Sequence, residues 1–439
     1  MNLNPELQRQ FYLEYSPARL IGIPLALWLL FTLCYYIDGY QLGSASARTA
    51  FTLFLIITLI WGARQSMNSI MEEFRERTWD IQRLSAIEPW TLVWGKLLGS
   101  NMMVWYGGLL CLIIYSLATP DGSHLPIVWF YCLGTGLTVQ SISLLIGQLA
   151  AQRGQIKAGA LFLPIIIGFF YIASKFSSIT AFSEAGNDLF SDNQRIIWYG
   201  MSFDSHLFYH FSLLLALFWS CVGNYRFMAQ ELGIRSLPWA WIAFNFCLMI
   251  YLAGYFSSEY SITLTAFLVT VVLTYLSLIT EPDIARQTQN LFRYAKLKAW
   301  QRFAEEMPLW CISFVLSIPT ALHLSLSTQP LTALTSLFHF YPLPILLLLL
   351  RDCSLFLYFN LEQNSRHAVN RTLLILAMLY AIIPGILSFT GISWLATLFF
   401  PLWANSESTA LVAALFQIFV LAYLLFLRIK LALMDGPKT

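Results

Sequence analysis

Long apolar stretches alternate with shorter polar segments along the whole chain. A helix needs about 20 mostly apolar residues to cross the hydrocarbon core of a bilayer, and about twelve stretches meet that length. The predicted spans are residues 18–37, 46–64, 98–118, 126–150, 156–174, 205–223, 237–256, 260–280, 308–327, 335–358, 369–390 and 408–428. This pattern predicts an all-α, polytopic integral membrane protein with about 12 transmembrane helices.

One predicted span contains a pair of charges. Arg351 and Asp352 interrupt 335–358 near the end that we expect to face the cytoplasm. Charge within a span points to function by default. Because long side chains near a span end extend toward the interface, the favoured interpretation is an interfacial ion pair that reaches the cytoplasm.

Composition supports the membrane assignment. Charged residues make up 11% of the 439 residues, apolar residues make up 58%, and mean hydropathy is +0.65. A typical soluble domain carries about 25% charged residues, so this chain has too few to cover a surface in water. The formal net charge of +2 lacks the basic excess of a nucleic-acid binder. A soluble enzyme, a disordered chain and a nucleic-acid binder are therefore excluded.

The distribution of cations predicts the orientation. Of 25 Lys and Arg residues, only Arg48, Lys175 and Arg195 fall clearly outside when the N-terminus is placed inside. The membrane potential and the anionic inner leaflet retain cations on the cytoplasmic side. We therefore expect an even number of spans with both termini in the cytoplasm.

The segment 1–17 is predicted to form an amphipathic helix ahead of the first span. Leu3, Leu7, Phe11 and Tyr15 recur every four residues and share one helical face. Aromatic side chains suit the headgroup level of a bilayer. We expect an interfacial helix whose apolar face meets the membrane and whose charged residues lie off that face.

The segment 65–97 is the most charged loop of the chain, with both signs alternating along it. We expect one helix from Met67 to Ser85 that continues inward from the preceding span. The dipeptide Glu88-Pro89 then breaks this helix, because the residue before proline avoids helical geometry and proline suits a helix start. The result is a charged helical hairpin on the cytoplasmic side.

This hairpin has two interpretations that the residue pattern does not separate. One is a solvated loop that its charges keep soluble. The other is a docking element for a soluble partner, with Trp79 and Leu84 as anchors and the charges fixing the register.

The chain is predicted to consist of two six-span halves, residues 1–224 and 225–439. The basic segment 281–307 reads as a second amphipathic interfacial helix, placed in the second half as 1–17 is placed in the first. Outside the membrane, 175–204 separates the fifth and sixth predicted spans. No residue-level repeat links the two halves.

Motifs for chemistry are absent from the sequence. There is no GxxxxGK(S/T) phosphate loop, no GxSxG elbow and no HExxH, and the seven cysteines show no CxxC spacing. His206 and His210 have a spacing that suits a metal, but a third ligand is not evident and polar fillers are the favoured interpretation. We therefore expect no catalytic residues, no metal site and no cofactor in this chain.

Polar residues in the third to fifth predicted spans also allow two interpretations. They either line a polar path for a substrate or bond within and between helices. These residues are Thr135, Thr138, Gln140, Ser141, Ser143 and Gln148.

Residues 72–96 resemble the permease subunits of ATP-binding-cassette exporters of the type-2 class. In that family the loop between the second and third spans carries an acidic helix, a Gly-Thr-apolar-acid step, a Leu, a Pro and a Gly-Lys pair. The matching residues are Glu72, Glu73, Thr78, Trp79, Asp80, Leu84, Pro89, Gly95 and Lys96. Arg77 departs from the family, which usually has glycine there, and a helix tolerates Arg better than Gly.

The resemblance implies that this loop is a coupling helix that docks an ATPase subunit. The docking residues would be Glu72, Glu73, Thr78, Trp79, Asp80 and Leu84. ATP would be bound by the partner, and the chain itself would be a transport subunit and not an enzyme. We also expect contact with membrane lipids and location in a bacterial inner (plasma) membrane. A homodimer is expected if only the first half couples; if both halves couple, with 351–368 as a weaker second coupling loop, one chain suffices.

A polytopic membrane enzyme, such as a lipid-linked glycosyl or acyl transferase, is the alternative function. Such an enzyme needs a catalytic acid or His in an outer loop near the bilayer. The only candidates are Asp38, His124, Glu184 and Asp188, and they form no recognisable motif.

Overall fold

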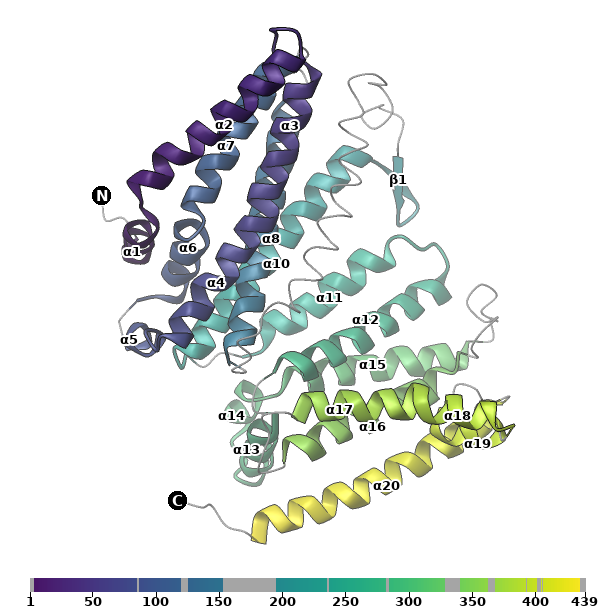
Figure 1. Cartoon of the computed structure of the whole chain (residues 1–439). Helices are drawn as coiled ribbons and strands as arrows, with labels where there is room; N and C mark the ends of the chain where they lie inside the picture. The colour runs from purple at the N-terminus through teal and green to yellow at the C-terminus, as the bar shows by residue number, and fades with distance from the viewer. Residues whose placement is uncertain are drawn as a thin grey trace. The chain divides into compact units, whose positions relative to one another are not determined.

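The computed structural model describes residues 4–84, 87–119, 125–152, 195–234, 237–281, 284–327, 340–361, 368–391, 393–400, 404 and 406–434. The chain divides into two compact units, which are treated separately below (Figure 1). Unit 1 comprises Met1–Ile196 and Ser202–Arg235, and unit 2 comprises Ile197–Met201 and Ser236–Thr439. The division falls after the predicted boundary at 224, because the helix that contains residue 224 continues to Glu231.

The described part of unit 1 is built from helices. They are α1 (Pro5–Glu14), α2 (Pro17–Ile37), α3 (Ser44–Leu55), the π-helical segment η1 (Ile56–Trp61), α4 (Gly62–Arg75), α5 (Trp79–Arg83), α6 (Pro89–Gly99), α7 (Met102–Ala118), α8 (Leu125–Gln152) and α10 (Ser205–Glu231). A two-stranded hairpin, β1 (Arg195–Trp198) and β2 (Met201–Asp204), precedes α10. Prolines occupy the first position of α1, α2 and α6, where a missing N–H has no helical partner to lose.

Unit 2 has a similar helical composition over its described residues. Its helices are α11 (Trp239–Ala253), α12 (Glu259–Thr280), α13 (Ile284–Lys296), α14 (Trp300–Glu305), α15 (Leu309–Leu326), α16 (Pro342–Asn360), α17 (Ala368–Ala377), the π-helical segment η6 (Met378–Ile382), α18 (Ile383–Phe389), α19 (Ser393–Phe399) and α20 (Glu407–Met434). Apolar side chains of α12, α15, α16 and α17 form its buried clusters.

The all-α polytopic fold is confirmed. Among the described residues, nine helices are long and apolar enough to cross a bilayer, and the pair α6–α7, bent by 51°, makes a tenth if it crosses as one broken span. The predicted span 237–256 corresponds to α11, whose 15 residues are short for a crossing. The predicted span 156–174 lies outside the described residues.

Polar side chains of α8 are buried between helices of unit 1. The amide of Gln140 donates to the carbonyl of Thr58 at 3.2 Å and accepts from the indole of Trp105 at 2.9 Å. Thr58 lies in η1, where the wider turn changes the backbone pairing that an α-helix would make. Asn224 of α10 donates to the carbonyl of Ser141 at 2.8 Å. These bonds join helices, so they account for Gln140 and Ser141 without a substrate path.

Arg351 and Asp352 lie within α16 and are 1% and 0% exposed. Asp352 accepts hydrogen bonds from Arg351 at 2.8 Å and from the hydroxyls of Tyr275 and Tyr380 at 2.5 and 2.7 Å. Arg351 also donates to Gln417 of α20. The expectation of a pair that reaches the cytoplasm is therefore wrong, because side chains of α12, η6 and α20 satisfy both charges where they are.

We predict that Arg351→Met strongly destabilises unit 2. The substitution removes the cation and leaves Asp352 buried without its charge partner, which typically costs about 3–5 kcal/mol. Thermal unfolding of the detergent-solubilised chain measures the effect. The matched double variant Arg351→Met/Asp352→Asn removes both charges and should recover much of the loss. Equal stability of wild type and Arg351→Met would show that the pair does not hold this unit together.

Candidate functional site

The loop between α4 and α6 forms the hairpin that the sequence predicts, but its first arm is not one helix. The helix α4 ends at Arg75, and α5 begins at Trp79. Three backbone N–H groups close the end of α4: Glu76 donates to Glu72 at 2.8 Å, Arg77 to Phe74 at 3.4 Å and Thr78 to Glu73 at 3.0 Å. This bonding is the Schellman pattern of a helix C-terminus.

Arg77 lies at the left-handed position of this turn, with φ of 59°. Glycine is the residue that adopts this conformation without steric cost. The expected continuous helix from Met67 to Ser85 is therefore wrong, and the comparison of Arg with Gly by helix propensity does not apply here. The position that usually holds glycine in the family is a turn position in this chain too.

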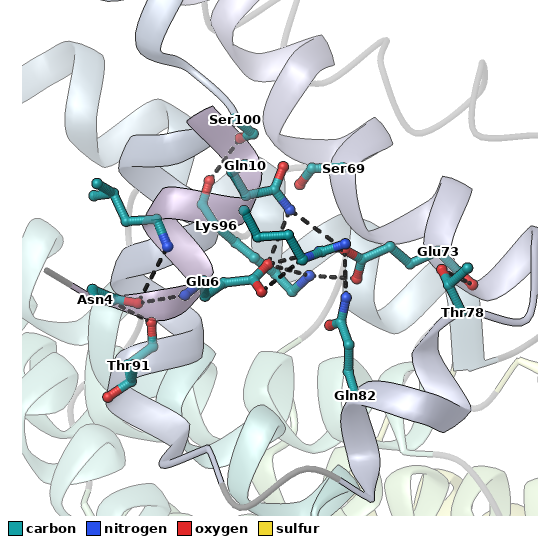
Figure 2. Close-up of polar contacts among 12 residues, drawn as sticks. Asn4, Glu6, Gln10, Ser69, Glu73, Thr78, Gln82, Thr91, Lys96 and Ser100 are labelled. Carbon is teal, nitrogen blue, oxygen red and sulfur yellow. Dashed lines mark hydrogen bonds and ion pairs between the residues drawn. The ribbon is translucent and has the colours of Figure 1, made fainter. Parts of the chain in front are cut away.

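Four charged side chains meet beneath the hairpin, as Figure 2 shows for three of them. Lys96 of α6 forms ion pairs with Glu73 of α4 and with Glu6 of α1, the latter at 3.2 Å. Arg9 pairs with Glu6 at 2.8 Å and also with Glu73. Two cations and two carboxylates thus balance one another. We call this set of Glu6, Arg9, Glu73 and Lys96 the four-charge cluster.

Three members of the four-charge cluster are buried, Arg9 is half-buried, and two glutamines add hydrogen bonds to its carboxylates. Lys96 is 0% exposed, Glu6 is 1% and Glu73 is 7%. Gln82 of α5 donates to Glu73 at 3.0 Å, and Gln10 donates to Glu6 at 3.0 Å. Buried ions need such partners, because their desolvation otherwise costs several kcal/mol per ion by order of magnitude. The cluster thereby ties α1, α4, α5 and α6 together.

The electrostatics of Glu6 show how the cluster depends on its partners. Burial opposes ionisation of this carboxyl, but the hydrogen bond from Arg9 and the charge of Lys96 outweigh burial and lower the pKa of Glu6. A lowered folded-state pKa contributes stability that is present above the unfolded-state pKa and is lost as pH falls through the lowered value. Docking of α1 is therefore supported at neutral pH and weakened by acid.

Two glycines of α6 let α1 approach closely enough to reach the cluster. A Cβ at Gly95 would lie 2.6 Å from Cβ of Glu6, and a Cβ at Gly99 would lie 2.6 Å from Cβ of Gln10. The Gly95-Lys96 pair, which contributed to the family resemblance, thus has a local reason. Gly95 leaves room for α1 to pack closely, and Lys96 forms an ion pair with Glu6 of α1.

The helix in 1–17 is confirmed, and a polar side of it packs against the protein. Glu6 and Gln10 are its buried residues, whereas Tyr12 and Tyr15 are 78% and 47% exposed. These polar residues face the protein because Glu73 of α4 and Lys96 of α6 are their partners there. Glu6, Arg9 and Gln10 were not predicted as site residues. Their only local signal was polar spacing along one side of the helix, and it did not identify the partners.

Trp79 lies in the core and not on the surface. It is 3% exposed, stacks on Phe74 with ring centroids 5.3 Å apart, and donates from its indole N–H to Glu231 at 3.4 Å. The Nζ atom of Lys96 lies 5.5 Å from its ring centroid. A buried side chain cannot act as an exposed anchor, so the structure assigns Trp79 to holding α5 against unit 1.

The other predicted docking residues divide by exposure. Glu72, Asp80 and Leu84 are exposed, Thr78 is half-buried, and Glu73 is buried in the cluster. Leu84 is 89% exposed, and Ile81, which the sequence analysis did not select, is 72% exposed. The hairpin therefore presents an apolar tip with charged residues around it.

Asp38, one of the acids that the enzyme alternative requires, has a structural role. Its carboxylate accepts from the backbone N–H of Ser46 at 2.9 Å, Ala45 at 3.1 Å and Gly43 at 3.2 Å, and so caps the start of α3. Desolvation opposes ionisation, but these bonds outweigh it and lower the pKa of Asp38. His124, Glu184 and Asp188 lie outside the described residues.

His206 and His210 lie near the start of α10. The side chain of His206 is not among the described ones, and His210 lies 3.2 Å from the hydroxyl of Tyr131. Within the part of the chain that the structure describes, no three His, Cys, Asp or Glu residues form a group suited to a metal.

The fold and the hairpin define a polytopic membrane protein whose second and third predicted spans are joined by a charged, partly apolar loop. Residues 36–191 match the family model described as ABC-2 family transporter protein. The match lies within unit 1 and confirms the resemblance to an ABC-2 type permease subunit. It supports a multi-pass membrane permease of an ABC transporter. Comparisons with curated proteins and with solved structures found no match.

We predict that Gly95→Ala weakens the packing of α1 against α6. The added Cβ meets Glu6 at 2.6 Å, and overpacking of this kind costs roughly 1–3 kcal/mol. Gly22→Ala in α2 is the matched control, because a Cβ there meets nothing within 4 Å. Hydrogen exchange of the α1 amides, followed by mass spectrometry, should accelerate in the first variant only. Unchanged protection of α1 in Gly95→Ala would contradict the close approach.

We also predict that Arg77→Gly stabilises the hairpin. Relief of the left-handed strain is worth about 1 kcal/mol, partly offset by the greater freedom of glycine in the unfolded chain. Exchange at the hairpin amides should slow, by at most about fivefold for that energy. Arg75→Gly, two residues earlier and still within α4, should instead speed exchange because glycine weakens a helix. Faster exchange in both variants would refute the turn geometry.

Proposed function

We propose that this chain is the membrane permease of an ABC exporter and that a separate ATPase docks on the hairpin between α4 and α6. The proposal rests on one observation above all. The hairpin exposes Ile81 and Leu84 at its tip while the four-charge cluster fixes its base to three other helices. An exposed apolar tip on a rigidly held loop suits the transfer of a push from a partner.

The contacts beneath the hairpin provide a path for such a push. The helix α5 is tied to Glu73 through Gln82 and is packed on unit 1 through Trp79. Glu73 is tied in turn to Lys96 of α6. A displacement of α5 therefore moves the start of the third predicted span, and closing and opening of an ATPase dimer would supply that displacement.

The remaining parts of the proposal come from the sequence. ATP belongs to the partner, because the chain carries no phosphate loop. The inward bias of Lys and Arg places both termini and the hairpin in the cytoplasm, where a soluble ATPase works. An inner bacterial membrane and outward transport complete the proposal.

We predict that Leu84→Ala weakens ATPase binding by about 1–2 kcal/mol, roughly tenfold, because an anchor at an interface carries most of the binding energy. Arg75→Ala should change binding by less than about 1 kcal/mol, since exposed ion pairs contribute little. The probe is the ATPase that co-purifies with the wild-type chain, identified by its own phosphate-loop sequence. The affinity is titrated in nanodiscs, together with ATP turnover.

The matched control is Leu117→Ala, which truncates another exposed leucine, 68% exposed, at the far end of α7 from α6. It should leave affinity and turnover unchanged. If Ile81→Ala and Leu84→Ala, alone and together, also leave both unchanged, the hairpin is a solvated loop and the proposal loses its main support.

A further inference from the structure

Unit 2 contains a second hairpin, formed by α13 and α14, whose backbone turn is the same as the turn between α4 and α5. At the end of α13, Leu297 donates to Arg293 at 3.1 Å, Lys298 to Ala295 at 3.2 Å and Ala299 to Tyr294 at 3.0 Å. These bonds have the same sequence offsets as those that close α4. Lys298 lies at the left-handed position with φ of 52°, as Arg77 does with φ of 59°.

The shared feature is more specific than the turn itself. Glycine holds the left-handed position at the ends of α2 and α10, at Gly39 and Gly233. The two hairpins instead place a cation there. A tryptophan follows two residues later in both and begins a short helix, Trp79 for α5 and Trp300 for α14.

Each hairpin is also closed by a glutamate that bridges its two arms. In the first, Gln82 of α5 donates to Glu73 of α4 at 3.0 Å. In the second, Asn290 of α13 donates to Glu306, just after α14, at 2.8 Å, and the hydroxyl of Tyr294 donates to the same carboxylate at 3.3 Å. The glutamate lies on the first arm of the first hairpin and just after the second arm of the second hairpin. In both hairpins its hydrogen bonds link the two arms across the turn.

The two hairpins occupy the same place in the order of elements. The first follows the long helix of Ser44–Arg75 and precedes α6, which begins at Pro89. The second follows α12 and α13 and precedes α15, whose N-cap is Pro308. In the sequence analysis 281–307 is an interfacial helix and 351–368 a weaker coupling loop. The described part of 351–368 is the end of α16 and the first residue of α17, and residues 362–367 lie outside the described residues.

The surfaces of the two hairpins differ in charge. The second exposes Trp300 and Leu297, which are 65% and 64% exposed. The exposed cations that flank them in sequence are Arg293, Lys296, Lys298 and Arg302. An exposed apolar pair flanked by cations fits an apolar slot bordered by carboxylates.

We propose that the α13–α14 hairpin is a second docking site for an ATPase subunit, one whose groove is acidic, so that one chain engages both subunits of an ATPase dimer. This inference rests on the proposed function of the first hairpin. A membrane surface is the competing occupant of a basic amphipathic helix. It is disfavoured because α13 begins with Ile284 in the core of unit 2, at 1% exposed, and because Leu297 and Trp300 lie at a turn and not along one helical face.

The test is photo-crosslinking of the full chain in nanodiscs that contain anionic lipid, with the co-purified ATPase bound. Benzoylphenylalanine replaces Leu84, Trp300 or, as control, Trp394, which is 74% exposed on α19. Adducts from positions 84 and 300 to a polypeptide with a phosphate loop, and none from 394, are the expected result. Position 300 linked only to lipid, with 84 linked to the ATPase, overturns the second site and leaves the proposed function standing. Absence of ATPase adducts from both positions overturns both.

Stoichiometry provides an independent measurement. Native mass spectrometry should find one chain with two ATPase subunits, and a complex of two chains with two subunits would overturn the inference. The charge-reversal variant Lys298→Glu/Arg302→Glu should lose about tenfold or more of the affinity for the second subunit, as expected for misplaced charges at an interface. It should keep the adduct from position 84. Retention of both subunits at wild-type affinity contradicts the acidic groove.

Discussion

Lys96 has no exposed surface, so its ammonium group depends on carboxylates that other parts of the chain bring to it. Glu73 arrives from the end of α4, and Glu6 arrives from α1, 90 residues away in the sequence. Gly95 and Gly99 exist at the contact because α1 must approach closely to deliver Glu6. The leading helix, the hairpin and the third predicted span thus take their mutual positions from the requirement to neutralise one buried charge.

Much of this architecture was predictable, because lipid imposes a simple pattern. A crossing helix must be apolar over a fixed length, and its ends are marked by polar residues and prolines. The hairpin was predicted for the same reason, since charge cannot remain inside the bilayer without partners. Its division at Arg77 was not, because nothing in the local sequence indicates a left-handed arginine. The only indication was that the related family usually has glycine there.

The side chains that face one another were harder to predict than the helices that carry them. Periodicity identified an apolar face of α1, but it did not indicate that Glu6 and Gln10 on another side are buried. The same reasoning predicted that the Arg351–Asp352 pair reaches the cytoplasm. The hydroxyls of Tyr275 and Tyr380 instead donate hydrogen bonds to Asp352 inside unit 2. In both cases the deciding partners are distant in sequence, and a pattern read within one helix contains no information about them. Trp79 illustrates the same limit, since its size suggested an anchor and its packing made it a core residue.

The four-charge cluster also constrains the order in which unit 1 assembles during synthesis. Glu6 and Glu73 are synthesised before Lys96, so both carboxylates lack this cation until α6 has been made. Arg9 is the only cation of the cluster available to them in that interval. The base of the hairpin can be completed only after α6, which carries Lys96, has been made. Assembly of this end of unit 1 is therefore a late event relative to the synthesis of its first two helices.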